Sequence, residues 1–138
     1  MKSIVMFGLA LVMMVGNLSC EAQTTKKQAK AIVSAKVEVY YFHFTRRCHT
    51  CESVEAESKK AVETLYPEQV KKGSTTFQAL NLDDDSSKKI AEKLKVSGQS
   101  LLVVKAGKQV DLTDKGFMYA TSNPEKLQAE IKKAIESL

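Results

Sequence analysis

The stretch VEVYYFHFTRRCHTC, residues 37–51, decides what this chain can fold into. Its first eight residues are rich in Val, Tyr and Phe and predict a buried strand. From Cys48 to about Tyr66 the apolar residues recur at helical spacing, and Pro67 marks the end of that helix. Two thiols, Cys48 and Cys51, are therefore predicted at a strand-to-helix junction. Backbone N–H groups and the helix dipole stabilise a thiolate at such a junction.

Strands and helices alternate along the rest of the chain. Further strands are predicted at residues 76–82, at 101–105 and between 109 and 119, and further helices at 86–94 and from the segment 122–125 onward. The aspartates at 83–85 supply a turn and an N-cap, and residues 106–108 form a hairpin turn. The order β-α-β-α-β-β-α predicts an α/β fold with a central mixed four-stranded sheet flanked by helices. The two early strand–helix–strand units imply parallel pairing with right-handed crossovers, and the hairpin adds an antiparallel edge strand.

Residues 1–22 predict an export signal, because Lys2 precedes an apolar run too short to span a bilayer, where roughly 20 residues are needed. The signal could end in a lipoprotein cleavage site, with Cys20 lipidated and Asn17 departing from the usual apolar residue. The alternative is ordinary cleavage near Ala22. Residues 23–35 are a polar linker or a short helix. The expected location is a bacterial envelope, either as a periplasmic protein or as a lipoprotein that contacts the membrane through its anchor.

The cysteine count bears on the role of the dithiol. If Cys20 carries a lipid or leaves with the signal, Cys48 and Cys51 are the only thiols that remain. A disulfide between them closes a very short loop, which gains the least stability from chain entropy. The net charge of +5 is spread as lysine pairs that alternate with acids, as on solvated helix faces. No nucleic-acid partner is expected for such a chain, and a monomer is expected.

The order of elements, with C-x-x-C after the first strand, resembles the thioredoxin fold over residues 36–138. The supporting motifs are Cys48-x-x-Cys51, the strand and turn at 79–83, and Gly98 followed by the apolar run 101–104 and the turn 106–108. The string Tyr40-Tyr41-Phe42-His43, with Arg47-Cys48 and Thr50-Cys51, is also similar to a narrower group. Its members are small exported thioredoxin-like proteins labelled as a nitrophenyl-compound nitroreductase subunit and linked to arsenic-resistance gene clusters.

The resemblance implies a thiol-disulfide oxidoreductase or redox module. Cys48 would be the nucleophile and Cys51 the resolving thiol, with protein thiols or disulfides, or a membrane redox partner, as the reaction partner. Arg47 and His49 would tune the pKa of Cys48 by favouring its thiolate. A stabilised thiolate makes a more oxidising protein, so we expect a potential less negative than the roughly −270 mV of thioredoxin. No cofactor is expected.

The sequence departs from thioredoxins in three places, and one of these departures, the missing proline, favours an alternative. Gln99 and Ser100 stand where thioredoxins place a cis-proline beside the dithiol, Arg47 replaces a Trp, and Phe42 occupies the position of a buried acid. Without the proline, Cys48 and Cys51, with His49 or His43, could instead bind Cu(I), Zn(II) or trivalent arsenic without catalysis. A purely structural disulfide is the third interpretation.

Overall fold

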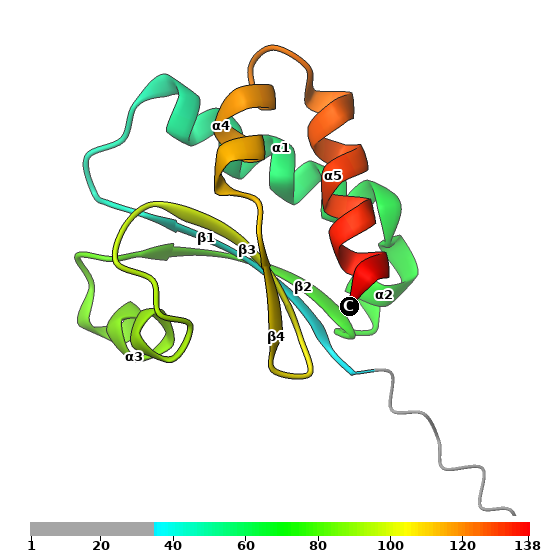
Figure 1. Cartoon of the computed structure of the whole chain (residues 1–138), viewed down its shortest axis with the longest axis horizontal. Coiled ribbons are helices and arrows are strands. Elements are labelled where there is room, and N and C mark those ends of the chain that lie inside the picture. The colour runs from blue at the N-terminus through cyan, green and yellow to red at the C-terminus, as the bar shows by residue number, and fades with distance from the viewer. Residues whose placement is uncertain (1–34) are drawn as a thin grey trace, which may run out of the picture. The chain divides into compact units, whose positions relative to one another are not determined.

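The computed structural model describes residues 35–138 (Figure 1). The expected signal at 1–22, with Cys20, and the expected linker up to residue 34 lie outside the described residues. The elements in chain order are β1 (Val37–His43), α1 (His49–Leu65), α2 (Pro67–Lys71), β2 (Thr75–Asn81), α3 (Asp85–Lys93), β3 (Ser100–Lys105), β4 (Lys108–Asp111), α4 (Thr113–Tyr119) and α5 (Pro124–Ser137). In this part of the chain, none of the helices is long and apolar enough to cross a bilayer.

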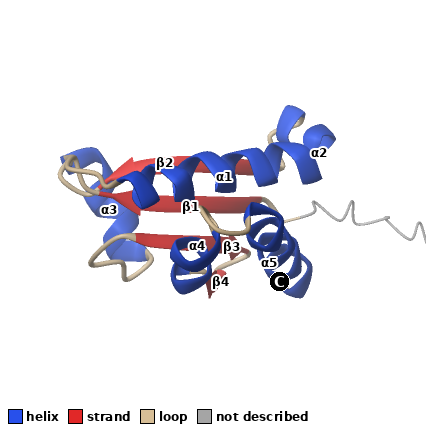
Figure 2. Cartoon of the chain, turned by 90° about the horizontal axis from the view of Figure 1, so that it is seen from above, coloured by secondary structure: helices blue, strands red, loops and turns tan. Residues whose placement is uncertain are grey.

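The strands form one sheet in the order β2-β1-β3-β4. β1 pairs in parallel with β2 and antiparallel with β3, and β4 is an antiparallel edge strand beside β3. Figures 1 and 2 show α1, α4 and α5 on one face of this sheet and α3 on the other. The predicted mixed four-stranded sheet flanked by helices is therefore confirmed, as is the parallel pairing of the first strand–helix–strand unit.

The predicted parallel pairing of the second unit is wrong. β2 and β3 are not neighbours, and β3 runs antiparallel to β1, with Phe42 opposite Ser100. The nine residues of α3 rise only about 14 Å, whereas a seven-residue strand spans about 23 Å. Because α3 is too short to carry the chain back along the sheet, β3 starts at the end where β2 stopped.

Two short helices were also missed, so the predicted order of elements is incomplete. Pro67 ends α1 as expected, but it also starts α2, because its fixed φ suits the first helical position. The predicted fourth strand stops at Asp111, whose carboxylate accepts hydrogen bonds from the Thr113 backbone N–H at 2.8 Å and from the Thr113 hydroxyl. Such a local turn favours helix over strand, and α4 follows.

The turn signals were otherwise correct. Ala106 and Gly107 both have positive φ, 51° and 80°, which fits the two-residue hairpin turn between β3 and β4. Asn123 caps α5 by accepting a hydrogen bond from the Lys126 backbone N–H at 3.1 Å. Asp84 occupies the N-cap position of α3, but its side chain makes no capping hydrogen bond.

The sheet separates two apolar clusters, because alternate residues of its central strands point to opposite faces. Val39, Tyr41 and Leu101 pack with α1, α4 and α5, whereas Tyr40 and Phe42 pack with α3. β1 is consequently buried on both faces, as its Val- and Tyr-rich sequence predicted. This central strand leads directly to the dithiol.

Helix α1 packs closely against the helix that follows the hairpin. A Cβ on Gly116 of α4 would lie 3.1 Å from Val54 Cγ1 and 3.2 Å from Leu101 Cδ2, so any larger residue would force these side chains to move by a few tenths of an ångström. Ser58 on α1 is fully buried, and its hydroxyl has no hydrogen-bond partner in the described part of the chain. The face of α1 behind the dithiol is therefore tightly packed.

Candidate functional site

Cys48 and Cys51 lie at the N-terminus of α1 and form a disulfide, with their Cα atoms 5.0 Å apart. Cys48 is the N-cap residue, and its sulfur accepts a hydrogen bond from the Cys51 backbone N–H at 3.1 Å. A thiolate at this position accepts the same bond more strongly, and the helix dipole favours its charge. The expected junction of strand, thiol pair and helix is present.

The two sulfurs have different surroundings. Cys48 is exposed, whereas Cys51 is only 3% exposed. An incoming disulfide can therefore reach Cys48, while Cys51 can react only with a group already held at Cys48. This asymmetry is what a nucleophile and a resolving thiol require.

Gln99 is brought to the dithiol, as its position before β3 suggested. Its Oε1 lies 3.6 Å from Cys51 Sγ. Because a disulfide sulfur carries no proton, this contact becomes a hydrogen bond only after reduction, when the Cys51 thiol can donate to the amide oxygen. Ser100 instead donates its hydroxyl to the Gly98 carbonyl at 3.0 Å, so it shapes the loop beside the site.

Arg47, the residue before Cys48, contacts Glu55 and Tyr41. Its guanidinium forms an ion pair with Glu55 on α1 and lies 6.0 Å from the centre of the Tyr41 ring. Burial raises the pKa of the Tyr41 hydroxyl above its usual value, and the charge of Arg47 opposes this effect. The sequence predicted Arg47 at the site but not Glu55. The signal was available, because Glu55 is four residues after Cys51 on the same helix.

The two histidines have separate surroundings. His49 is exposed at the first position of α1, where its carbonyl accepts the Ser53 hydroxyl at 3.0 Å. His43 Nδ1 lies 3.0 Å from the Phe44 carbonyl oxygen, and its ring stacks on Tyr41 with centroids 6.0 Å apart. Within residues 35–138, no three His, Cys, Asp or Glu side chains are grouped closely enough to share a metal ion.

The loop between β1 and α1 is tied to the end of β2. The Thr45 backbone N–H donates to Asp83 Oδ2 at 2.8 Å, and Asn81 Nδ2 donates to the Thr45 hydroxyl at 2.9 Å. The bond from Thr45 lowers the pKa of Asp83 below its usual value. The aspartate run at 83–85 thus contributes one tether to the loop that carries Arg47 and Cys48.

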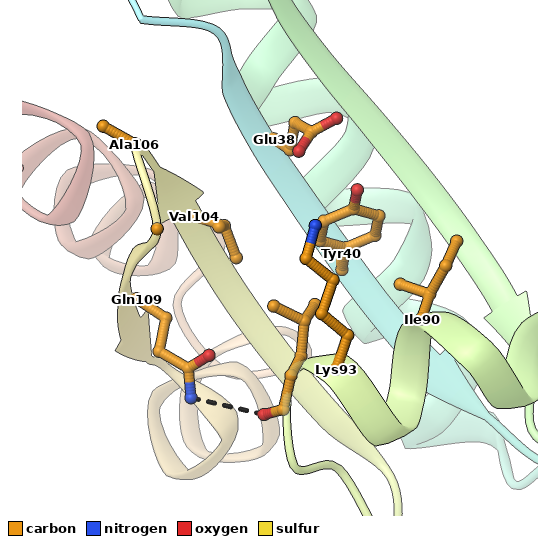
Figure 3. Close-up of a pocket in the computed structure, with 9 residues that line it drawn as sticks. Glu38, Tyr40, Ile90, Lys93, Val104, Ala106 and Gln109 are labelled. Atoms are coloured by element: carbon orange, nitrogen blue, oxygen red, sulfur yellow. Dashed lines mark hydrogen bonds between the residues drawn. The ribbon is translucent and has the colours of Figure 1, made fainter.

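A cavity of about 230 Å³ lies at the other end of β1, away from the dithiol. Figure 3 shows Glu38 and Tyr40 from β1 facing Ile90 and Lys93 from α3 across it. Gln109 donates a hydrogen bond to the Leu94 carbonyl at 3.4 Å on its other side, drawn dashed in Figure 3. Burial and the nearby Glu38 carboxylate raise the pKa of Tyr40 to about 12. Neither cysteine lines this cavity.

No protein-family model matches the chain, and no curated protein matches it. Among solved structures, the chain is similar to one described as a malarial protein, with 20% identity and a TM-score of 0.48 over 72% of this chain and 97% of the other. It is also similar to the germline-specific thioredoxin Deadhead of Drosophila melanogaster, with 17% identity and a TM-score of 0.44 over 73% of this chain and 83% of that one.

The mixed four-stranded sheet, the helices on both of its faces and the position of the cysteine pair agree with the fold that the sequence predicted, although the direction of β3 does not. Residues 35–138 have a thioredoxin-like α/β fold with a C-x-x-C disulfide at the N-terminus of the helix that follows the central strand.

Proposed function

We propose that the chain is a thiol-disulfide oxidoreductase, or a redox module of one, that reacts through Cys48 and Cys51. The observation that carries the proposal is the asymmetry of the pair. Cys48 is exposed and accepts a backbone N–H bond at the start of α1, while Cys51 is buried directly behind it. A structural staple has no need of an exposed, stabilised first sulfur.

The reaction needs no group from outside the pair and its partner. The Cys48 thiolate attacks one sulfur of a partner disulfide, a mixed disulfide forms, and the other partner sulfur leaves as a thiolate. Cys51, after losing its proton, then attacks Cys48 Sγ and releases the second partner thiolate. The protein dithiol is oxidised to a disulfide and the partner disulfide is reduced to a dithiol. The reverse sequence oxidises a partner dithiol.

The test compares two variants, each with one cysteine of the pair replaced by Ser, in the reduction of a model protein disulfide such as that of insulin. Cys48→Ser is expected to abolish exchange, because the one cysteine that remains among residues 35–138, Cys51, is buried. Cys51→Ser is expected to form a mixed disulfide that persists, visible as a mass increase under non-reducing conditions. Equal reactivity of the two cysteines toward the substrate would contradict the roles assigned here.

The competing proposal is a soft-ion module that binds Cu(I), Zn(II) or trivalent arsenic through the same sulfurs. A structural zinc site has four ligands. Within the described residues, His49 and the two cysteines do not form a group close enough to bind one metal ion. Cu(I) or a trivalent arsenical, which accept few thiolates, would suit the reduced pair better. Titration of the reduced protein with each ion separates the proposals: tight binding together with slow exchange favours the module.

Export and the partner are further parts of the proposal. We expect residues 1–22 to direct the chain to a bacterial envelope, with Cys20 as the lipidated residue and the redox domain facing protein thiols or a membrane redox partner. The exposed side chain of Phe44 lies in the loop that leads to Cys48, where an apolar partner surface could contact it. Cell fractionation of the whole chain and its Cys20→Ser variant tests this, since loss of the lipid should move the protein from the membrane to the soluble fraction.

A further inference from the structure

We propose that Glu55 is a positioning residue of the dithiol: by neutralising Arg47, it makes the reduced cysteines harder to ionise and the protein a weaker oxidant. This inference rests on the proposed redox function and concerns the side chain that shifts the equilibrium between the oxidised and reduced protein. Arg47 was expected to favour the thiolate of Cys48. The ion pair with Glu55 reduces that effect.

The position of Glu55 places its charge near both sulfurs. Residues four apart on a helix are neighbours, with Cβ atoms about 5–6 Å apart, so Glu55 lies one turn beyond Cys51. Helical side chains lean toward the N-terminus of the helix. The ion pair joins Glu55 to Arg47, the residue before Cys48, across the first two turns of α1. Its charge therefore lies along the turn that holds the disulfide.

The pair is also less screened than the other ion pairs of the domain. The side chains of Arg47 and Glu55 are 21% and 30% exposed, whereas those of Lys59 and Glu63 on the same helix are 59% and 54% exposed. Partly buried charges interact more strongly because less water surrounds them. Removing the charge of Glu55 should consequently change the ionisation of the cysteines, whereas removing the charge of Glu63 should not.

The direction of the effect follows from the signs of the charges. Removing the Glu55 carboxylate leaves Arg47 as an uncompensated positive charge beside Cys48, which favours the thiolate and so the reduced form. Removing Arg47 leaves a negative charge beside both sulfurs and has the opposite effect. The other ionisable groups on the surrounding elements are Arg46, His49 and Glu52 beside the pair, Tyr41 and His43 on β1, Asp83 after β2, and Asp114 and Lys115 on α4. They are the same in every variant compared.

The experiment uses Glu55→Gln, Arg47→Gln, the double variant, and Glu63→Gln as the matched control. Two quantities are measured for each: the pH profile of Cys48 alkylation by iodoacetamide in the reduced protein, and the equilibrium constant with a glutathione buffer. We expect Glu55→Gln to shift that constant about tenfold toward the reduced protein, which for this two-electron couple is about 30 mV, with a matching fall in the pKa of Cys48. Arg47→Gln should shift both readouts the other way.

The double variant checks the signs of the two shifts. It should lie within about threefold of the wild type, since the opposite shifts of the single variants cancel when both charges are removed. The inference is overturned if Glu55→Gln matches Glu63→Gln in both readouts, or if the double variant shows the sum of two shifts of the same sign. The alkylation profile needs no disulfide exchange. It therefore tests Glu55 even if Cys48→Ser shows that the protein exchanges no disulfides.

Discussion

Reduction of the Cys48–Cys51 disulfide should leave the domain folded. The bond closes a loop of only four residues. The chain-entropy relation gives such a loop about 2 kcal/mol of stabilisation in the oxidised protein. Neither apolar cluster depends on the bond, because both are built from the central strands and the helices that cover them.

A Cys48 thiolate in the reduced protein would make this difference in stability between the oxidised and reduced forms smaller. Above about pH 8.5, the pKa of a cysteine in an unfolded chain, each unit by which folding lowered the pKa of Cys48 would stabilise the reduced form by about 1.4 kcal/mol, and this contribution is lost as the pH falls through the folded pKa. We therefore expect the oxidised protein to be more stable than the reduced one by at most about 2 kcal/mol. In a domain of this size, that is a difference in Tm of roughly 8–16 °C or less.

Urea unfolding of three proteins measures this: oxidised wild type, reduced wild type, and the reduced Cys48→Ser/Cys51→Ser variant. The double variant has neither the bond nor a thiolate, so its difference from the oxidised protein reports the loop contribution plus the cost of a Ser hydroxyl at the buried Cys51 position. That cost does not change with pH, so a reduced wild type that gains stability over this variant as pH rises shows thiolate stabilisation. If reduction lowers the free energy of unfolding by more than about 4 kcal/mol, the small contribution expected of this short loop is wrong and the structural interpretation of the disulfide is supported.

Three further results are expected from the packing and the charges. Ser58→Ala should raise the free energy of unfolding by about 1 kcal/mol in urea, because it removes a buried hydroxyl that has no partner in the described residues; Ser53→Ala, at a hydroxyl that is hydrogen-bonded, should not. Gly116→Val should lower it by about 1–3 kcal/mol, and an unchanged midpoint would contradict the close contact of α4 with α1. Since the pKa of Tyr40 is raised from 10 to about 12, its contribution is complete below pH 10 and is lost as pH rises toward 12. Tyr40→Phe should flatten that part of a pH–stability curve, and an unchanged slope would argue against the shift.

The sequence predicted those parts of the fold that depend on local pattern. The Val- and Tyr-rich run 37–43 could only be a buried strand, and the residues around Asn123 carry a complete helix start. The wrong predictions concerned the direction of β3 and the end of β4. α3 is too short to return the chain along the sheet, and an apolar pattern does not reveal this. The fourth strand, predicted between residues 109 and 119, stops at Asp111, whose side chain bonds to Thr113 and starts a turn.

At the site, the sequence predicted which backbone positions come together, but not the ion pair between Arg47 and Glu55. Cys48, Cys51 and Gln99 were placed together because the order of strands and helices fixes where their backbone lies. Glu55 was missed because its effect depends on a side-chain contact with Arg47 across the first turns of α1. Ion pairs of this kind depend on the rotamers of two long side chains, which sequence spacing allows but does not require.

The central position of β1 has a consequence for hydrogen exchange. Its backbone is paired on both edges and covered on both faces, so its amides should exchange only when the whole domain unfolds. Cys48 follows five residues later in the exposed loop and first turn. The amides of residues 46–48 should exchange through local opening, at rates that do not follow global stability, whereas the Thr45 amide, which donates to Asp83, should exchange more slowly. Cys48 would then lie on a segment that can change conformation when a partner binds, while β1 remains folded.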